Sequence, residues 1–222
     1  MEEEKTIQPG YSAAVEEDGG SGVYDEIAAT VEAHNNAAQP GEPYWGIAIA
    51  NSTYTVYEYG EVPQPPTEEE KKELLRSEKL SAMSEACEKT IYNGMDVLFG
   101  DGTQEHFSLD EADQNNIDGI FSAVTLGATA YPYHADGQSC RMYSAKDIVT
   151  LYVSKQSFIT KQTTYHNALK QWIERETSYA VLEGISYGVE LPEDLAKGVQ
   201  AILTEANEQA QAIVAKLTGS AG

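Results

Sequence analysis

The segment Gly184-Ile185-Ser186-Tyr187-Gly188 matches the Gly-x-Ser-x-Gly pattern that presents a nucleophilic serine at a sharp turn. Such a serine needs a buried strand before it and a histidine base later in the chain. The residues before Ser186 have a helical pattern instead, and no histidine follows His166. We therefore interpret Gly184 and Gly188 as helix-ending residues, and the sequence predicts no catalytic serine here.

Acidic residues between positions 110 and 118 suggest a second kind of chemistry, the binding of calcium. Asp110, Asp113, Asn115 and Asp118 have the residue types of a calcium loop. Counted from Asp113, however, the fifth position is Ile117 and the sixth is Asp118, where the loop needs an oxygen ligand and then glycine. We interpret these acids as the solvated face of a helix.

The four histidines do not have the spacing of a local metal site. They are His34, His106, His134 and His166. His134, beside Tyr133 and Asp136, would meet His106 only if two predicted hairpins lie together, and a hydrogen-bonded hairpin histidine is the preferred interpretation. The sequence thus predicts no catalytic residue, no metal and no cofactor, and the protein is not expected to be an enzyme.

Cysteines and tyrosines indicate compartment and contacts rather than catalysis. Cys87 and Cys140 form no paired motif, which is typical of a reducing compartment. Among the 14 tyrosines, clusters occur at Tyr54/Tyr57/Tyr59 and at Tyr131/Tyr133. Tyrosine favours half-solvated contact surfaces, so these clusters indicate interfaces; strand residues that cover a small core are an equally good explanation.

The charge excludes some partners. The net charge is −22, from 36 acidic and 14 basic residues, which opposes nucleic acid binding and favours a partner with basic patches. Residues 1–66 carry 12 of the acids and a single base, Lys5.

The chain has no apolar run long enough to span a membrane. Its start, Met1-Glu2-Glu3-Glu4-Lys5, is unlike a secretion signal, so we expect synthesis in the cytoplasm.

Turn and capping patterns predict an α+β fold. The expected divisions are an acidic flexible arm (1–22), a small helix and β-hairpin segment (23–62), a proline-rich linker (63–66), a core (67–188) and a C-terminal helix (189–222). The first hairpin should turn at Asn51-Ser52.

Within the core, a helix–hairpin–helix–hairpin–helix order is expected. Asp101-Gly102 and Asp136-Gly137 predict hairpin turns, the first of type I′ with two left-handed residues. Three capping patterns start the helices, at Thr67–Glu70, Ser108–Glu111 and Ser144–Asp147.

The last helix, from Pro192, has an apolar stripe with spacings of three and four residues. Its members are Leu195, Val199, Ile202, Ala206, Ala210, Ile213 and Leu217. The pattern favours a coiled coil or a docking helix; folding back onto its own domain is the alternative.

Residues 71–177 resemble a domain of unknown function that is common in tail-fibre and baseplate loci of tailed phages and prophages. The resemblance is carried by Asn93–Val97, Phe107–Ile117, Tyr133–Gly137, Met142–Ile148 and Tyr165–Leu169. Members of that family have no agreed activity, so the resemblance assigns no site residues.

The resemblance implies a non-catalytic structural component of a phage or prophage tail, in the fibre or baseplate region. Such a protein would bind other tail or fibre proteins, with a basic partner surface and a homo-oligomer both left open, and would not bind nucleic acid or membrane. It would be made in the host bacterial cytoplasm and reside in the virion tail. A tail-fibre assembly chaperone is the main alternative; a host-interacting or enzymatic prophage protein is the third.

Overall fold

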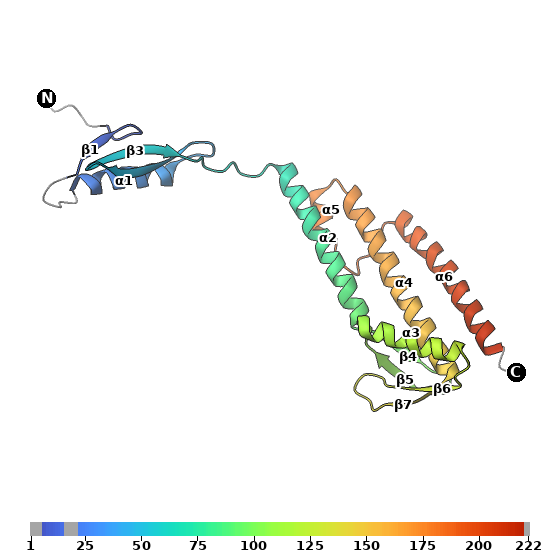
Figure 1. The fold of residues 1–222 in the computed structure, drawn as a ribbon. Helices are drawn as coiled ribbons and strands as arrows, with labels where there is room; N and C mark the ends of the chain where they lie inside the picture. Colours follow the sequence, from blue (N-terminus) through green and yellow to red (C-terminus); the bar gives the residue numbers. More distant parts are fainter. Residues whose placement is uncertain (1–5, 16–21, 220–222) are drawn as a thin grey trace, which may run out of the picture. The chain divides into compact units, whose positions relative to one another are not determined.

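The structure is a computed structural model that describes residues 6–15 and 22–219. It contains two compact units, Met1–Glu69 and Glu70–Gly222 (Figure 1). Both combine helices with short antiparallel strands, so the fold is α+β, as predicted. The predicted linker at 63–66 lies in a segment that has neither helix nor strand.

The first unit is a three-stranded sheet with one helix. Its elements are β1 (Ser12–Ala14), α1 (Gly22–Ala37), β2 (Tyr44–Ala50) and β3 (Thr53–Tyr59). The strands are antiparallel in the order β1-β3-β2. The predicted turn between β2 and β3 is confirmed, because Asn51 (φ 48°) and Ser52 (φ 54°) are both left-handed, as a two-residue type I′ turn requires.

Helix α1 covers one face of this sheet (Figure 1). Ile27 and Val31 of the helix bury Val56 of β3 in a small core. His34 stacks on Trp45 with ring centroids 3.8 Å apart, which holds the C-terminal part of α1 to β2.

The prediction that residues 1–22 are a flexible arm is wrong for residues 6–15. Residues 12–14 form β1, which pairs with β3 from Ser12 opposite Thr55 to Ala14 opposite Thr53. Ile7, Tyr11 and Ala13 pack on the small core. The acidic composition of the whole segment hid this short apolar alternation. Gly22 begins α1, and the remaining residues of the predicted arm, 1–5 and 16–21, lie outside the described residues.

The second unit contains the predicted order of helices and hairpins, with one additional short helix, α5. Its elements are α2 (Glu68–Tyr92), β4 (Met95–Leu98), β5 (Gln104–Phe107), α3 (Glu111–Thr125), β6 (Ala130–Tyr133), β7 (Arg141–Ser144), α4 (Ala145–Arg175), α5 (Tyr179–Gly184) and α6 (Glu193–Gly219). α2, α4 and α6 run side by side, and the two hairpins and α3 lie at one end of them (Figure 1).

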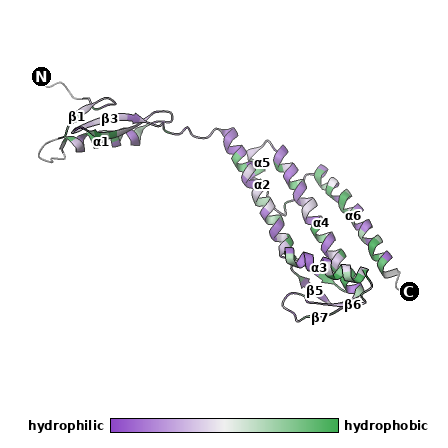
Figure 2. Ribbon diagram, in the orientation of Figure 1, coloured by the Kyte–Doolittle hydropathy of each residue, from purple (hydrophilic) through white to green (hydrophobic). Residues whose placement is uncertain are grey.

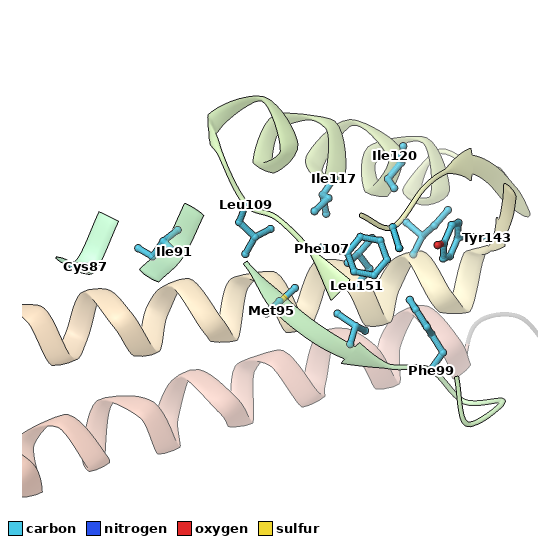
Figure 3. Close-up of a cluster of buried hydrophobic side chains, with 13 residues drawn as sticks. Cys87, Ile91, Met95, Phe99, Phe107, Leu109, Ile117, Ile120, Tyr143 and Leu151 are labelled. Atoms are coloured by element: carbon cyan, nitrogen blue, oxygen red, sulfur yellow. The ribbon is translucent and has the colours of Figure 1, made fainter. Parts of the chain in front are cut away.

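The main core of this unit lies where α3, α4 and the hairpins meet. Figure 3 shows Phe107 and Tyr143 pointing into a cluster with Leu109, Ile117 and Leu151, all of which are almost completely buried. Such close packing of both hairpins around shared aromatic rings fixes the hairpins on the helices.

A second cluster joins α2, α4 and α5. Met83, Leu169 and Leu182 are buried there. Two cations of α2 supplement it: Arg76 donates to the carbonyl oxygen of Glu176 (2.9 Å), and Lys79 donates to that of Ile185 (2.8 Å). These oxygens follow α4 and α5, so α2 supplies donors for backbone groups that the helices leave unpaired.

The predicted hairpins are confirmed, but their turn geometry differs from the prediction. Gly102 (φ 88°) and Gly137 (φ 67°) are left-handed, whereas neither preceding aspartate is. Between β4 and β5, the N–H of Gly102 donates to Phe99 and the N–H of Phe99 donates to Thr103. This is a three-residue loop that needs one left-handed glycine, and the type I′ prediction is wrong there.

Of the predicted helix caps, the Ser144–Asp147 capping box is confirmed with both of its hydrogen bonds. At α3 the cap is Asp110, whose side chain accepts from the N–H of Asp113. The hydroxyl of the predicted cap, Ser108, instead lies within hydrogen-bond distance of the carboxylates of Asp113 and Asp136, and its backbone N–H donates to Asp136. Ser108 thereby ties the second hairpin to the start of α3, a tertiary contact that a local pattern does not contain.

The last helix, α6, lies against α4 of the same unit (Figure 1). Its hydrophobic residues recur along the helix, whereas α2 is largely hydrophilic (Figure 2). Ile202 and Ile213 of the predicted stripe are 53% and 42% exposed, and Leu203 and Val214 are half-buried. The other five members of the predicted stripe are half-buried, so the inward face keeps most of that stripe, with Leu203 and Val214 in place of Ile202 and Ile213. None of the described α6 side chains is fully buried. No helix in the described part of the chain has the length and hydrophobicity needed to cross a membrane.

Candidate functional site

The sheet face opposite α1 is the candidate functional site. Because side chains alternate along a strand, the residues not packed under α1 share the other face. They are Ser12, Ala14, Tyr44, Gly46, Ala48, Ala50, Thr53, Thr55, Tyr57 and Tyr59, here called the open sheet face. None of them is charged. The one charged residue within the three strands, Glu58, pairs with Trp45 and belongs to the face that α1 covers.

Three tyrosines form a cluster on the open sheet face. Tyr44 lies opposite Tyr59 in the ladder, with ring centroids 5.9 Å apart, and Tyr57 and Tyr59 are also 5.9 Å apart. A Cβ atom at Gly46 would lie 2.7 Å from Cζ of Tyr57, so the Tyr57 ring covers Gly46 closely. A side chain at Gly46 would push this ring from its position, so glycine permits the observed arrangement of the cluster.

The cluster is suited to binding a protein surface. Tyr57 and Tyr59 remain 44% and 50% exposed, although they contact each other. Tyrosine rings provide apolar contact area with little loss of rotamer entropy, and their hydroxyl groups can donate or accept hydrogen bonds at a half-solvated interface. The surrounding Ala, Ser and Thr side chains are small and add no charge that a partner would have to desolvate.

The structure divides the predicted tyrosine clusters between exposed positions and positions packed against a core. Tyr57 and Tyr59 lie on the open sheet face, whereas Tyr54 faces α1 and contacts Tyr24 at 5.4 Å between centroids. Tyr133 stacks on Phe107 in the second unit, and its burial raises its pKa to about 12. Tyr131 is 42% exposed.

Ser186 does not lie in a nucleophile elbow. The short helix α5 precedes it, and its carbonyl oxygen accepts from the N–H of Val189 in a turn. Gly188 (φ 94°) is the left-handed residue of that turn, and its N–H donates to the hydroxyl of Tyr165. The two glycines of the motif thus lie at a helix end and in a turn.

The acids from the calcium-like segment belong to helix α3 and its cap. Asp118 pairs with the ammonium group of Lys155, which is only 1% exposed. Lys155 also donates to the carbonyl oxygen of Gln114 (3.3 Å). The ion pair and this hydrogen bond both connect α3 to α4. Asp110 and Asp113 take part in the α3 cap.

The hairpin histidine His106 lies near Asp136, and both of its ring nitrogens are in hydrogen bonds with other groups. Its Nδ1 is 2.8 Å from Asp96 Oδ1, and its Nε2 is 2.8 Å from the carbonyl oxygen of Asn93. The bond to Asp96 and that to Asn93 raise the pKa of His106. Across residues 6–15 and 22–219, no group of three or more His, Cys, Asp or Glu side chains is placed to hold a metal ion.

Cys87 and His166 line the same pocket, of about 420 Å³, between α2, α3 and α4. The Cys87 thiol is buried and donates to the carbonyl oxygen of Gln162 at 3.7 Å. Desolvation lowers the pKa of His166, and Nε2 of its ring has no hydrogen-bond partner in the described structure. The thiol donates to a backbone carbonyl, Nε2 of His166 accepts from no group in the described structure, and the lowered pKa makes the ring a weaker base. The two side chains therefore lack the hydrogen bond by which a histidine activates a thiol.

Sequence reasoning did not identify Gly46, Tyr44 or Asn35 as important. Strict alternation along β2 would have placed Tyr44 and Gly46 on the same face as Tyr57 and Tyr59, so that signal was available. Asn35 hydrogen-bonds the backbone of Trp45 from α1, ten positions away. No local pattern predicts this contact.

The comparisons with known proteins assign a family to the second unit. No curated protein and no solved structure matches the chain. The model of a domain of unknown function, DUF4376, matches residues 74–186, a range that begins in α2 and ends after α5. The match covers half of the chain and includes both hairpins, and the chain belongs to the DUF4376 family.

Proposed function

We propose that this protein is a non-catalytic structural component of a phage or prophage tail, in the fibre or baseplate region, that acts through protein–protein contacts. The open sheet face is the observation that carries the contact role, because it presents three tyrosines and no charge. The tail context rests on the resemblance of residues 71–177 to a domain of tail-fibre and baseplate loci.

The charge of residues 1–66 suggests the chemistry of the partner. Residues 1–66 carry 12 acidic side chains and one basic side chain. A partner with an apolar patch and nearby Lys and Arg residues would complement both the uncharged face and the acidic charge of residues 1–66. Long-range attraction would speed association and weaken as salt is added, while the tyrosines would supply most of the contact energy.

In this proposal the protein is made in the host bacterial cytoplasm and stays in the mature tail. An assembly chaperone for tail fibres would use the same face, but it would leave before the particle is complete. The two roles differ in where the protein is found, and the same experiment separates them.

The test is quantitative mass spectrometry of particles purified through a density gradient, from the phage or prophage that encodes the protein. A structural component is expected at a fixed ratio to the other tail proteins. Tyr59→Lys should lower its incorporation by about ten-fold or more, because it places a charge in the tyrosine cluster. Tyr131→Lys is the control: Tyr131 is also an exposed strand tyrosine, but it lies outside the open sheet face.

The other outcomes are also informative. A protein that is absent from particles but co-purifies with newly made fibres is a chaperone. Absence from both contradicts the proposed function. Equal incorporation of the Tyr59 and Tyr131 variants would leave the tail location intact but would contradict the role of the open sheet face.

A further inference from the structure

The outer edge of β2 offers backbone groups for strand pairing. β2 is the last strand in the order β1-β3-β2. Because a two-residue turn joins Ala50 to Thr53, that pair closes the hairpin with hydrogen bonds, and every second residue of β2 directs its N–H and C=O to β3. Trp45, Ile47 and Ile49 therefore direct these groups outward, away from β3.

One of these outward positions is blocked by a side chain. The N–H of Trp45 donates to Oδ1 of Asn35 (2.8 Å), and Nδ2 of Asn35 donates to the carbonyl oxygen of Trp45 (2.9 Å). In the described part of the chain, the outward groups of Ile47 and Ile49 have no such partner. The open edge is thus a short window between the Asn35 contact and the turn at Asn51-Ser52.

We propose that this window pairs with the same window of a second copy of the chain, so that two sheets join into one six-stranded antiparallel sheet. About a two-fold axis at Ala48, Ile47 of each copy lies opposite Ile49 of the other. Each of these two residue pairs exchanges two backbone hydrogen bonds, so all four outward groups of each window are satisfied. Further along, Trp45 of one copy lies opposite Asn51 of the other, where the Asn35 contact and the turn end the pairing.

The side chains of β2 are compatible with this pairing. Natural edge strands are usually protected by charged residues, proline or bulges, and β2 contains neither a charged residue nor proline. Ile49, which is 64% exposed, would be covered by Ile47 of the other copy. Ala48 is exposed and small, so two copies approach at the axis without a clash. The inference concerns the sheet edge and does not depend on the proposed tail function.

Charge gives the pairing a distinctive salt dependence. The β2 strands bring no like charges directly opposite each other, but residues 1–66 of each copy carry 12 acids and one base. This longer-range repulsion is screened by salt, so salt should strengthen the dimer. Docking of the open sheet face on a basic partner has the opposite dependence, and the failure of one proposal is therefore distinguishable from the failure of the other.

The experiment is sedimentation equilibrium of the full chain over a concentration series, at about 0.05 M and about 0.3 M NaCl. A dimer is expected whose Kd falls at the higher salt concentration. Ala48→Lys should raise that Kd by about ten-fold or more, because two lysines would meet at the axis. Ala14→Lys is the matched control: it is the same exposed change on the same face, but on β1 at the other edge, and it should leave the Kd unchanged.

A second measurement on the unmodified protein keeps the proposal testable if a variant misfolds. Hydrogen exchange at the amides of Ile47 and Ile49 should slow as protein concentration rises. A protein that is monomeric at every concentration, exchange that does not depend on concentration, or a dimer that Ala48→Lys leaves intact would each overturn the inference. So would a dimer that is dissociated by Ile213→Lys and not by Ala48→Lys, because α6 would then be the interface.

Discussion

At the scale of single residues, Gly94 and Gly102 are required for different reasons. A side chain has no room at Gly94, whereas at Gly102 only the backbone conformation favours glycine. Both are left-handed, with φ of 84° and 88°. A Cβ atom at Gly94 would lie 1.9 Å from the carbonyl oxygen of Phe107, whereas nothing lies within 4 Å of one at Gly102. We expect Gly102→Ala to lower the free energy of unfolding by about 1 kcal/mol. Gly94→Ala should cost roughly 3 kcal/mol or more, since backbone atoms must move.

Urea unfolding of the two variants, followed by far-UV circular dichroism, measures this difference. The Gly102 variant is the control for the general cost of a side chain at positive φ. Equal destabilisation of the two would show that the contact between the end of α2 and β5 is looser than its geometry indicates. An unchanged midpoint for Gly102→Ala would contradict the left-handed turn.

His106 should make stability depend on pH near neutrality. Its bond to Asp96 favours the protonated ring and raises its pKa above the ordinary value of 6.5. The resulting stabilisation is fully present below that ordinary value and is lost as pH rises through the higher folded-state pKa. We therefore expect the free energy of unfolding to fall above pH 6.5 more in the native protein than in His106→Gln.

Urea unfolding at several pH values checks the His106 prediction. His166 provides an internal contrast, because desolvation lowers its pKa and its contribution has the opposite sign. Both proteins contain His166, so its contribution cancels when the free energy of unfolding of His106→Gln is subtracted from that of the native protein. A difference that is constant with pH would mean that the bond to Asp96 does not persist in solution.

At the scale of elements, α6 should be less stable than the helix it contacts. Its described side chains are at most half-buried, whereas α4 buries Ala168, Leu169 and Ile173. The ion pair between Arg175 and Asp194 joins the two helices, but both side chains are substantially exposed and such pairs contribute little. We expect α6 amides to exchange with deuterium about ten-fold faster than the amides of residues 168–173, or faster still.

Mass spectrometry of deuterium uptake checks this prediction for α6. Peptides from the centre of α2 are the control, because α2 buries Met83 and Cys87. Equal protection of α6 and α4 would show that α6 is an integral part of the core rather than a helix docked on it.

Elements that obey local rules could be predicted from the sequence. The turn at Asn51-Ser52 and the cap at Ser144 each depend on residues at most three positions apart, and both are present. The cap at Ser108 was mispredicted because a tertiary contact, to Asp136 of the next hairpin, uses its hydroxyl group. β1 was missed because its pairing with β3 has a separation of about forty residues, which no local pattern contains.

The candidate site was predictable only in part, for a related reason. Alternation along β3 is a local property, so Tyr57 and Tyr59 were candidates from the sequence alone. Which face is exposed depends on the side that α1 covers, and the position of the Tyr57 ring depends on its contact with Gly46. Both are tertiary features. The contact of Asn35 with Trp45, which limits the open edge of β2, is tertiary as well.

At the scale of the whole molecule, charge density distinguishes the two units. The net charge is −22, and residues 1–66, with 12 acids and one base, carry half of it on less than a third of the chain. Repulsion among like charges destabilises a folded unit most where these charges are dense, and salt screens it. The first unit should therefore gain more stability from salt than the second.

The two tryptophans allow each unit to be followed separately, since Trp45 belongs to the first unit and Trp172 to the second. Fluorescence of Trp172→Phe and Trp45→Phe should give two distinct melting temperatures. Between about 0.02 M and about 0.3 M NaCl, we expect the Tm reported by Trp45 to rise by roughly 5 °C, equivalent to roughly 1 kcal/mol. The Tm reported by Trp172 should rise by less, and it serves as the control for general salt effects. Equal shifts would contradict the argument from charge density. A shift that grows with protein concentration would come from pairing of β2 strands, whereas relief of repulsion within one chain is independent of concentration.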